Sequence, residues 1–346
     1  IYVRQGTYFE QISIPTSSIQ LKAFDNERPL IDGQRKREYG ICDTQEAAIE
    51  NVSIEGFEIA NQTRMGICLS HRENKGAIIR GNVIHHIVVR GVDVRGARHR
   101  IEENIIYMIG NDQESMGIRL AGAEDCVIEN NDVFLCRKTA IRDQTGKRNL
   151  IQSNLMHECW TGLDLNSSSG AKVFNNVIYN NCQGANPKHV TGSAGWNRLW
   201  HNTFYGNHGP HISIAVNRAT GDEGPGPDCD YLDIRNNILL KCGATHIWNK
   251  PDIVGEHLVI DGNLYHGPPG WPPFFYHTQW PRSGRPGLKS SADVRRRTPF
   301  MSTGVDCDPN LIDPDGGNFD YPVDSPASKG GAALDSPFGN QLGARG

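Results

Sequence analysis

Short hydrophobic stretches interrupted by single polar residues recur along most of this chain. In one pattern an Asn precedes a pair of mostly aliphatic residues, and in the other a small residue opens an alternation of apolar and polar positions. The Asn positions are 82, 104, 131, 154, 176, 202, 237 and 263. The second pattern begins at Gly66, Gly91, Gly117, Ala140 and Gly162. Each repeat therefore predicts two or three short strands and no helix.

The interval between repeats indicates how these strands are arranged. The Asn positions are 22 to 27 residues apart, with one longer step of 35 between Asn202 and Asn237. Strands joined by turns too short for a crossover helix stay parallel only if the chain coils, with successive coils about 4.8 Å apart. We therefore expect an all-β solenoid, a right-handed parallel β-helix. Leucine-rich repeats have a similar period but need several Leu and a helical return in each repeat, and both are missing here.

The pattern also predicts the extent of the fold. The regular coils are expected over about residues 45–265, with a loop and an extended tail over about 266–346, and residues 1–346 are treated as a single domain. Asn suits the coil corners because it tolerates left-handed backbone angles and its amide can bond the Asn of the next coil. Cys136, Cys159, Cys182 and Cys242 look like a second inner column of buried free thiols. Metal binding by that column is disfavoured, because parallel stacking offers no tetrahedral arrangement.

Strand alternation predicts which side chains face outward. If Ile67, Val92, Ile118, Ile141, Leu163 and Ile212 point inward, a first outward column follows directly after them. That column comprises Cys68, Asp93, Arg119, Arg142, Asp164, Asn186 and Ser213. A second outward column, two residues further on, comprises Ser70, Arg95, Ala121, Gln144, Asn166 and Lys188. One face of the predicted solenoid thus gathers several cationic side chains.

Two long interruptions leave the regular coils. Residues 218–230 account for the 35-residue step, and a loop of this kind on a rigid solenoid is typical of a binding wall. Residues 266–300 are rich in Pro and contain Trp271, Tyr276 and Trp280. These rings either cap the end of the solenoid or stack against sugar rings of a substrate.

Composition and charge narrow the choice of partner. Apolar residues with Gly make up about 45% of the 346 residues, which is ordinary for a soluble protein with a large core. The net charge of −4 argues against nucleic-acid or membrane binding by the whole surface. No apolar stretch is long enough to span a membrane, and the chain begins inside structure, as if a leader had been removed. We expect a secreted or periplasmic monomer.

A cationic strip on a β-helix face suits an extended anionic ligand, above all a polysaccharide of uronic acids. Arg119 and Arg142 would clamp the uronate carboxylate through paired hydrogen bonds. Neutralising that carboxylate makes the neighbouring C5 proton removable, and Lys188 is the candidate base for β-elimination. His189, His208 and His211 are alternative bases that titrate nearer neutrality. The remaining substrate contacts would come from Arg95, Asp93, Asn166 and Asn186, and from Trp271, Tyr276 and Trp280.

The chain resembles the right-handed β-helix polysaccharide lyases, which include pectate, alginate and chondroitin lyases. The resemblance is carried by the Asn-rich coils over about residues 45–265. Within that group, Gly162-Leu163-Asp164-Leu165 and Lys188 are similar to the strand and the basic Lys of calcium-dependent pectate lyases. Trp160-Thr161 stands where that family has paired aspartates. The resemblance implies Ca²⁺ as a candidate cofactor, and Asp93, Asp143 and Asp164 are the nearby oxygen ligands.

Three other functions remain open. A glycoside hydrolase would use paired carboxylates about 5 to 9.5 Å apart. Asp143 and Asp164, on adjacent coils, suit that separation, but alternation turns Asp143 inward. A uronate C5-epimerase shares the proton abstraction of a lyase, and a carbohydrate-binding β-helix would show no turnover.

Overall fold

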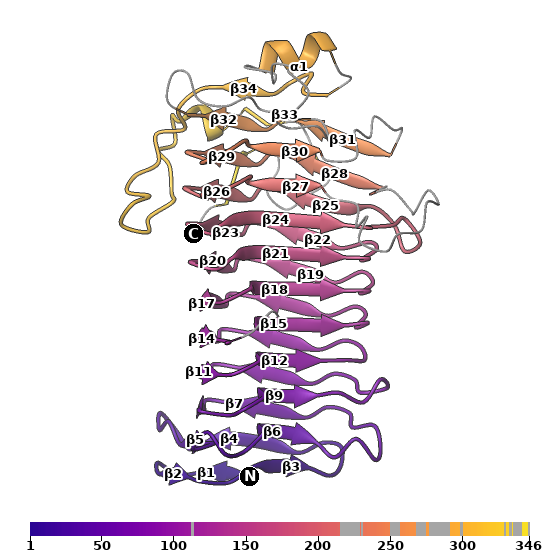
Figure 1. The fold of residues 1–346 in the computed structure, drawn as a ribbon, viewed down its shortest axis with the longest axis vertical. Helices are drawn as coiled ribbons and strands as arrows, with labels where there is room; N and C mark the ends of the chain where they lie inside the picture. The colour runs from indigo at the N-terminus through magenta and orange to yellow at the C-terminus, as the bar shows by residue number, and fades with distance from the viewer. Residues whose placement is uncertain are drawn as a thin grey trace. The chain divides into compact units, whose positions relative to one another are not determined.

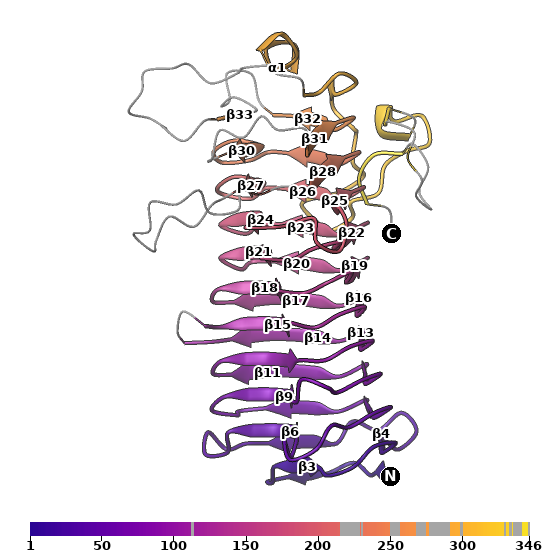
Figure 2. The same ribbon diagram turned by 90° about the vertical axis from the view of Figure 1, so that its right-hand side faces the viewer.

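The computed structural model describes residues 1–111, 114–214, 229, 231–249, 257–267, 275–276, 291–297, 300–328, 330–331, 334 and 341–344. The chain divides into two compact units, unit 1 (Ile1–Trp160) and unit 2 (Thr161–Gly346). Figures 1 and 2 show that strands make up most of each unit. The single domain expected from the sequence stays a prediction, and each unit is described by itself.

Unit 1 consists of parallel strands in three sheets, A1, B1 and C1, through which the chain passes in turn. Sheet A1 contains β1 (Tyr2–Val3), β4 (Gln20–Ala23), β7 (Ser53–Glu55), β10 (Ile78–Arg80), β13 (Arg100–Glu102), β16 (Val127–Glu129) and β19 (Leu150–Gln152). Sheet B1 contains β2 (Thr7–Tyr8), β5 (Leu30–Asp32), β8 (Glu58–Ala60), β11 (Val83–Ile87), β14 (Ile105–Ile109), β17 (Asp132–Cys136) and β20 (Leu155–His157). Sheet C1 contains β3 (Ile12–Ile14), β6 (Tyr39–Asp43), β9 (Met65–Leu69), β12 (Arg90–Val94), β15 (Met116–Ala121) and β18 (Thr139–Gln144).

Unit 2 repeats the plan with sheets A2, B2 and C2. Sheet A2 contains β22 (Lys172–Phe174), β25 (Asn197–Trp200), β28 (Leu232–Arg235) and β31 (Leu258–Asp261). Sheet B2 contains β23 (Val177–Tyr179), β26 (Thr203–Tyr205), β29 (Ile238–Leu240), β32 (Leu264–His266) and β34 (Val305–Asp306). Sheet C2 contains β21 (Thr161–Asn166), β24 (Gln183–Lys188), β27 (Ile212–Ile214), β30 (Ile247–Asn249) and β33 (Phe275–Tyr276).

The predicted parallel β-helix is confirmed, and its coils are more extensive than the Asn pattern indicated. Strands already pair at Tyr2, well before residue 45, and β34 pairs with β32 beyond residue 265. The described residues contain one short α-helix, α1 (Ser291–Arg297), and one 3₁₀ turn (Pro326–Ser328). No helix among them is long and apolar enough to cross a membrane.

The predicted Asn ladder is present in both units. In unit 1 the Asn104 side-chain amide donates to Asn131 Oδ1 at 2.9 Å, and Asn131 donates to Asn154 in the same way. These side chains are buried, so each rung satisfies polar groups that water cannot reach. The left-handed backbone angle, however, belongs to the residue before the ladder position, such as Asn130 with φ of 55°. The amide, rather than tolerance of positive φ, therefore accounts for Asn at the ladder positions.

The inner columns follow the predicted register with one correction. Ile67, Val92, Ile118 and Ile141 lie opposite one another in sheet C1 and are fully buried. All nine cysteines are free, but Cys182 is exposed and does not belong to the predicted inner column. Its neighbour Asn181 takes the inward position and donates to Asn207 Oδ1 at 3.1 Å. The 23-residue spacing of the cysteines could not show this shift by one residue.

The predicted C-terminal tail packs along the coils of unit 2. Phe319, Tyr321 and Leu342 are buried in one hydrophobic cluster with Tyr205 and Ile238 of sheet B2. The Tyr321 hydroxyl donates to the Leu342 carbonyl at 2.7 Å, which ties two parts of the tail together. The tail thus covers apolar side chains on the outer surface of B2.

Candidate functional site

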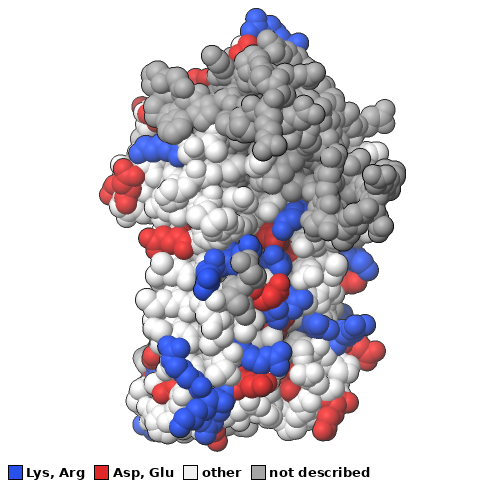
Figure 3. Space-filling model, viewed as in Figure 1, with Lys and Arg blue, Asp and Glu red and all other residues white. Residues whose placement is uncertain are grey.

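The outward side chains of sheet C1 form a continuous row across neighbouring strands. Cys68, Asp93, Arg119 and Arg142 lie opposite one another from β9 to β18, as alternation predicted. Figure 3 shows Lys and Arg side chains gathered with a few acidic ones on the face that carries these strands. Asp93 has only 4% of its surface exposed, so the row is less open to solvent than expected. Long neighbouring side chains cover its acidic member.

A basic pocket of about 370 Å³ opens where β9, β12, β15 and β18 end. It is lined by Arg72, Arg95, Gly96, Arg119, Ala121, Gly122, Gln144 and Thr145. Its volume falls within the range of about 300–1,000 Å³ typical of ligand pockets. At Gly96 the backbone φ is 103°, and an added Cβ would lie 2.0 Å from the Asn74 carbonyl oxygen, so only glycine fits this turn. The pocket therefore combines three guanidinium groups with close backbone.

A buried carboxylate holds one of these guanidinium groups in place. Asp93 Oδ2 lies 2.7 Å from Arg90 Nη1 and 3.2 Å from Arg119 Nη1. Arg119 also donates from Nε to Gln144 Oε1 at 3.1 Å. Bonds on two sides fix the guanidinium plane, so Arg119 is positioned before any ligand arrives.

The positive charges of the pocket exceed its negative charge. Burial lowers the pKa of Arg119, Asp93 opposes this, and the neighbouring charges of Arg90 and Arg95 lower it further. Within the part of the chain that the structure describes, Arg72 and Arg95 form no ion pair. An anion bound in the pocket would relieve the repulsion between these cations. The arrangement is therefore suited to a carboxylate or another anionic group.

Two other predicted residues of unit 1 lie elsewhere. Arg142 is in register with Arg119 but does not line the pocket. The pocket therefore does not combine Arg119 and Arg142 into the expected carboxylate clamp. Asp143 points inward as alternation predicted, is fully buried and accepts a bond of 3.1 Å from Asn149. Its carboxylate is not available on the outer face to a metal ion or a substrate.

In unit 2, sheet C2 carries a separate ion pair on its outward side. Lys188 Nζ lies 3.4 Å from Asp164 Oδ2, and Asp164 is 2% exposed. Asn186 is in register with Asp164, and Asn166 with Lys188, as the sequence predicted. Lys188 is thus an ammonium partner of a buried carboxylate, with part of its side chain open to solvent.

The three histidines proposed as alternative bases differ in their burial. His189 follows β24 directly, has a φ of 48° and is half-buried. His208 is exposed. His211 is fully buried inside the coil, and burial lowers its pKa to about 3. Its position contradicts a role as a base on the outer face.

Some predicted contacts lie outside the described residues. These are Trp271, Trp280, the side chain of Tyr276, and residues 218–228 and 230 of the predicted loop. Cys229 is described; it is buried, and its thiol lies 3.4 Å from the Pro187 carbonyl oxygen.

Two important residues of unit 1 were missed by strand alternation. Arg72 belongs to the turn after β9, where the two-residue alternation of a strand does not apply and the direction of a side chain cannot be predicted from it. Arg90 stands before a corner at which Gly91 and Val92 both point inward, so counting back by twos from Val92 turns Arg90 the wrong way. The excess of Arg in the segment 90–100 was the available signal.

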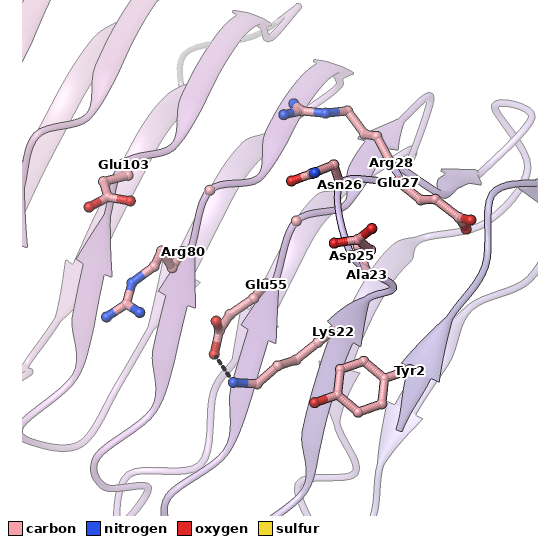
Figure 4. Close-up of a pocket in the computed structure, with 12 residues that line it drawn as sticks. Tyr2, Lys22, Ala23, Asp25, Asn26, Glu27, Arg28, Glu55, Arg80 and Glu103 are labelled. Carbon is pink, nitrogen blue, oxygen red and sulfur yellow. Dashed lines mark ion pairs between the residues drawn. The ribbon is translucent and has the colours of Figure 1, made fainter.

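A second pocket of unit 1 is larger but has a different charge pattern. It has a volume of about 740 Å³, and cationic Lys22, Arg28 and Arg80 stand among acidic side chains. The acidic side chains in its lining are Asp25, Glu27, Glu55 and Glu103. Figure 4 shows Lys22 reaching Glu55, with the two charges 3.0 Å apart. Because acidic side chains outnumber cationic ones in its lining, this pocket is less suited to a strongly anionic ligand.

Comparison with known proteins supports the fold. Residues 40–207 match the family model described as a right handed beta helix region. No curated protein matches the sequence. Pectate lyase Pel9A matches with a TM-score of 0.61 at 14% identity, over 99% of this chain and 86% of that one. The A-module of the mannuronan C-5 epimerase AlgE6 from Azotobacter vinelandii matches with a TM-score of 0.59 at 15% identity, over 89% of this chain and 84% of that one.

A further match shows how widely this architecture is used. The structure of XylC with xylose matches with a TM-score of 0.50 at 14% identity and covers 80% of this chain. This chain spans only 56% of that structure. At such identities the likeness shows a shared right-handed parallel β-helix and no particular activity.

Proposed function

We propose that this β-helix chain binds an acidic, uronate-containing polysaccharide in the basic pocket of unit 1 and cleaves it by β-elimination. The observation that carries the proposal is the group of three guanidiniums, Arg72, Arg95 and Arg119, of which two form no ion pair among the described residues. Successive coils present side chains at about 5 Å intervals, close to the length of one sugar residue.

The chemistry follows from neutralisation of the substrate carboxylate. Arg119, held by Asp93 and Gln144, can receive a carboxylate in a fixed orientation. A neutralised carboxylate stabilises the carbanion that forms when the C5 proton is removed. The C4–O bond then breaks, the double bond forms between C4 and C5, and the leaving oxygen takes up a proton. The pectate lyase and the epimerase that share this fold support this class of chemistry.

Lys188 is the proposed base, and it is tested separately from the pocket. A lysine removes a proton only as a free amine, so its ion pair with Asp164 has to open during the reaction. No calcium step is included in the proposed reaction. Asp93 already holds two guanidiniums and Asp143 points inward, so these two carboxylates do not fit a calcium site.

A C5-epimerase is the second candidate, because the epimerase of the same fold begins with a uronate as well. A hydrolase is less favoured, since the inward direction of Asp143 removes one of the two carboxylates it would need.

Incubation with alginate, pectate, glycosaminoglycans and neutral glycans tests the proposal. We expect ultraviolet absorbance from unsaturated uronides together with new reducing ends on one of the acidic polymers. Reducing ends without that absorbance would favour hydrolysis. Solvent deuterium entering C5 without chain cleavage would favour the epimerase. Neither signal, with binding retained, would leave a carbohydrate-binding protein.

A further inference from the structure

One corner of the coil, directly before the inward aliphatic residue of the C-sheet strands, is occupied by a very small residue in most repeats. The residues at this corner are Gly66, Gly91, Gly117, Ala140, Gly162 and Gly184. In unit 2 an added Cβ at Gly162 would lie 2.5 Å from Ile178 Cγ2, inside the coil. The corner therefore points inward and leaves almost no space for a side chain.

In the next two coils of unit 2 this corner holds histidine. Ala185 pairs with Ile212, and Ile212 pairs with Ile247, so the residues before them, His211 and His246, occupy the same place as Gly184. The exposed fractions of the two side chains are 0% and 4%, and their ring centroids are 5.3 Å apart. Two imidazoles thus replace the smallest side chain at a fixed position of the repeat. Such a local break of a consistent pattern is typical of a functional site.

A thiol lies beside the two rings. Cys242 is 5% exposed, and the ligand atoms of His211, Cys242 and His246 all lie within 4.8 Å of one another. Among the described residues this is the one group of at least three metal-ligating side chains at such distances. We propose that His211, Cys242 and His246 bind a transition metal ion of the zinc class in the interior of unit 2.

The donor set fits such an ion. Imidazole nitrogen and thiolate sulfur are the ligands that Zn²⁺ prefers, at about 2.0–2.3 Å, so the three side chains have to approach one another by about 1 Å. His211 Nε2 donates to the Leu240 carbonyl at 2.8 Å, which leaves the lone pair on Nδ1. Nδ1 now accepts from the Asn207 amide at 2.9 Å, and a metal ion would take over that lone pair. Asn207 keeps its bond to the Ile178 carbonyl, and the Leu240 bond orients the ligating ring.

The protonation states are compatible with loading during folding. Burial lowers the pKa of His211 to about 3 and that of His246 well below its usual range, so both imidazoles are neutral, as metal binding requires. Burial also raises the pKa of the Cys242 thiol to about 12, so binding releases one proton. Because all three side chains are buried, the ion has to enter before the coils close.

Refolding of the full chain with Co²⁺ tests the proposal, because a thiolate ligand gives cobalt a near-ultraviolet charge-transfer band. We expect this band at one Co²⁺ per chain, its loss on addition of Zn²⁺ during a second refolding, and its absence in Cys242→Ser. The matched control is Cys159→Ser, which removes another buried thiol, 4% exposed, from the interior of unit 1. That variant should keep the band.

Three results would overturn the proposal: no band in the refolded wild-type chain, a band that persists in Cys242→Ser, or a band that is lost in folded Cys159→Ser. If Cys242→Ser fails to fold, the wild-type chain still decides the question. Zn²⁺ present during refolding should then raise the melting temperature in proportion to the logarithm of its concentration, while Mg²⁺ should not. A melting temperature unchanged by Zn²⁺ would count against the site.

Discussion

The outward rows of sheets C1 and C2 each bury one aspartate, but they surround it differently. In C1, Asp93 is shared by Arg90 and Arg119, and Arg72 and Arg95 add positive charge nearby. In C2, Asp164 is paired with Lys188. The first arrangement leaves an excess of positive charge around a pocket, whereas in the second the Lys188 ammonium lies 3.4 Å from the Asp164 carboxylate. The excess of positive charge is the reason for proposing that an anionic ligand binds on unit 1. In that proposal Lys188 acts as a base only after its ion pair opens.

Replacement of the C2 lysine should have the largest effect on turnover. We expect Lys188→Ala to reduce the rate of β-elimination by about 10²–10⁴-fold, the usual contribution of a general base. Lys188→Arg should not restore the rate, because a guanidinium does not lose its proton. The rate of unsaturated-uronide formation measures both variants, and exposed Lys172→Ala of the same unit is the matched control. Wild-type turnover by folded Lys188→Ala would exclude it as the base.

Replacement of the C1 arginine should mainly affect binding. We expect Arg119→Ala to weaken binding of acidic oligosaccharides by about 10–100-fold, because charge-assisted hydrogen bonds contribute about 1.5–3 kcal/mol. Calorimetric titration measures the affinity. Arg80→Ala, which removes a guanidinium from the larger pocket of Figure 4, where acidic side chains outnumber cationic ones, should bind as wild type does. Equal losses in the two variants would remove the distinction between the two pockets.

A buried histidine of unit 2 makes the stability of the protein depend on pH. Burial lowers the pKa of His201 in unit 2 to about 4, and its Nδ1 donates to the Gln341 carbonyl of the tail at 2.8 Å. A histidine with a lowered folded-state pKa stabilises the protein above its unfolded pKa of about 6.5, and this contribution is lost as the pH falls towards 4. We expect the free energy of unfolding to fall by about 2 kcal/mol between pH 7 and pH 5 on account of this residue.

Urea denaturation at the two pH values measures this change. His201→Asn, which has no titrating ring, should show a smaller difference between pH 7 and pH 5 than the wild-type chain. An identical pH dependence in both proteins would show that His201 is not responsible.

Sequence periodicity was sufficient to predict the strands of the coils, but it was insufficient to predict which way side chains point at the corners between strands. The Asn82 to Asn263 ladder and the inward Ile118 column repeat at a fixed place, because each coil has to bury the same atoms. At corners, however, two consecutive side chains turn inward, so strict alternation gives the wrong direction for Arg90 and His211. Arg72 lies in a turn, where neither period applies. Register could thus be predicted from a single sequence, but the membership of the pocket required the path of the backbone between strands.

The smallest expected effect in this comparison concerns the more exposed arginines of the basic pocket of unit 1. Arg72 and Arg95 form no ion pair within the described residues, so they should interact with a ligand mainly through a screened Coulomb field. We expect Arg72→Gln to weaken binding of an acidic oligosaccharide by about threefold at low salt, since exposed charge pairs contribute about 0.2–1 kcal/mol. At 0.5 M NaCl the variant and the wild-type chain should bind alike, whereas the defect of Arg119→Ala, whose guanidinium is largely buried, should persist. A defect of Arg72→Gln that survives high salt would mean that Arg72 contacts the ligand as directly as Arg119 does.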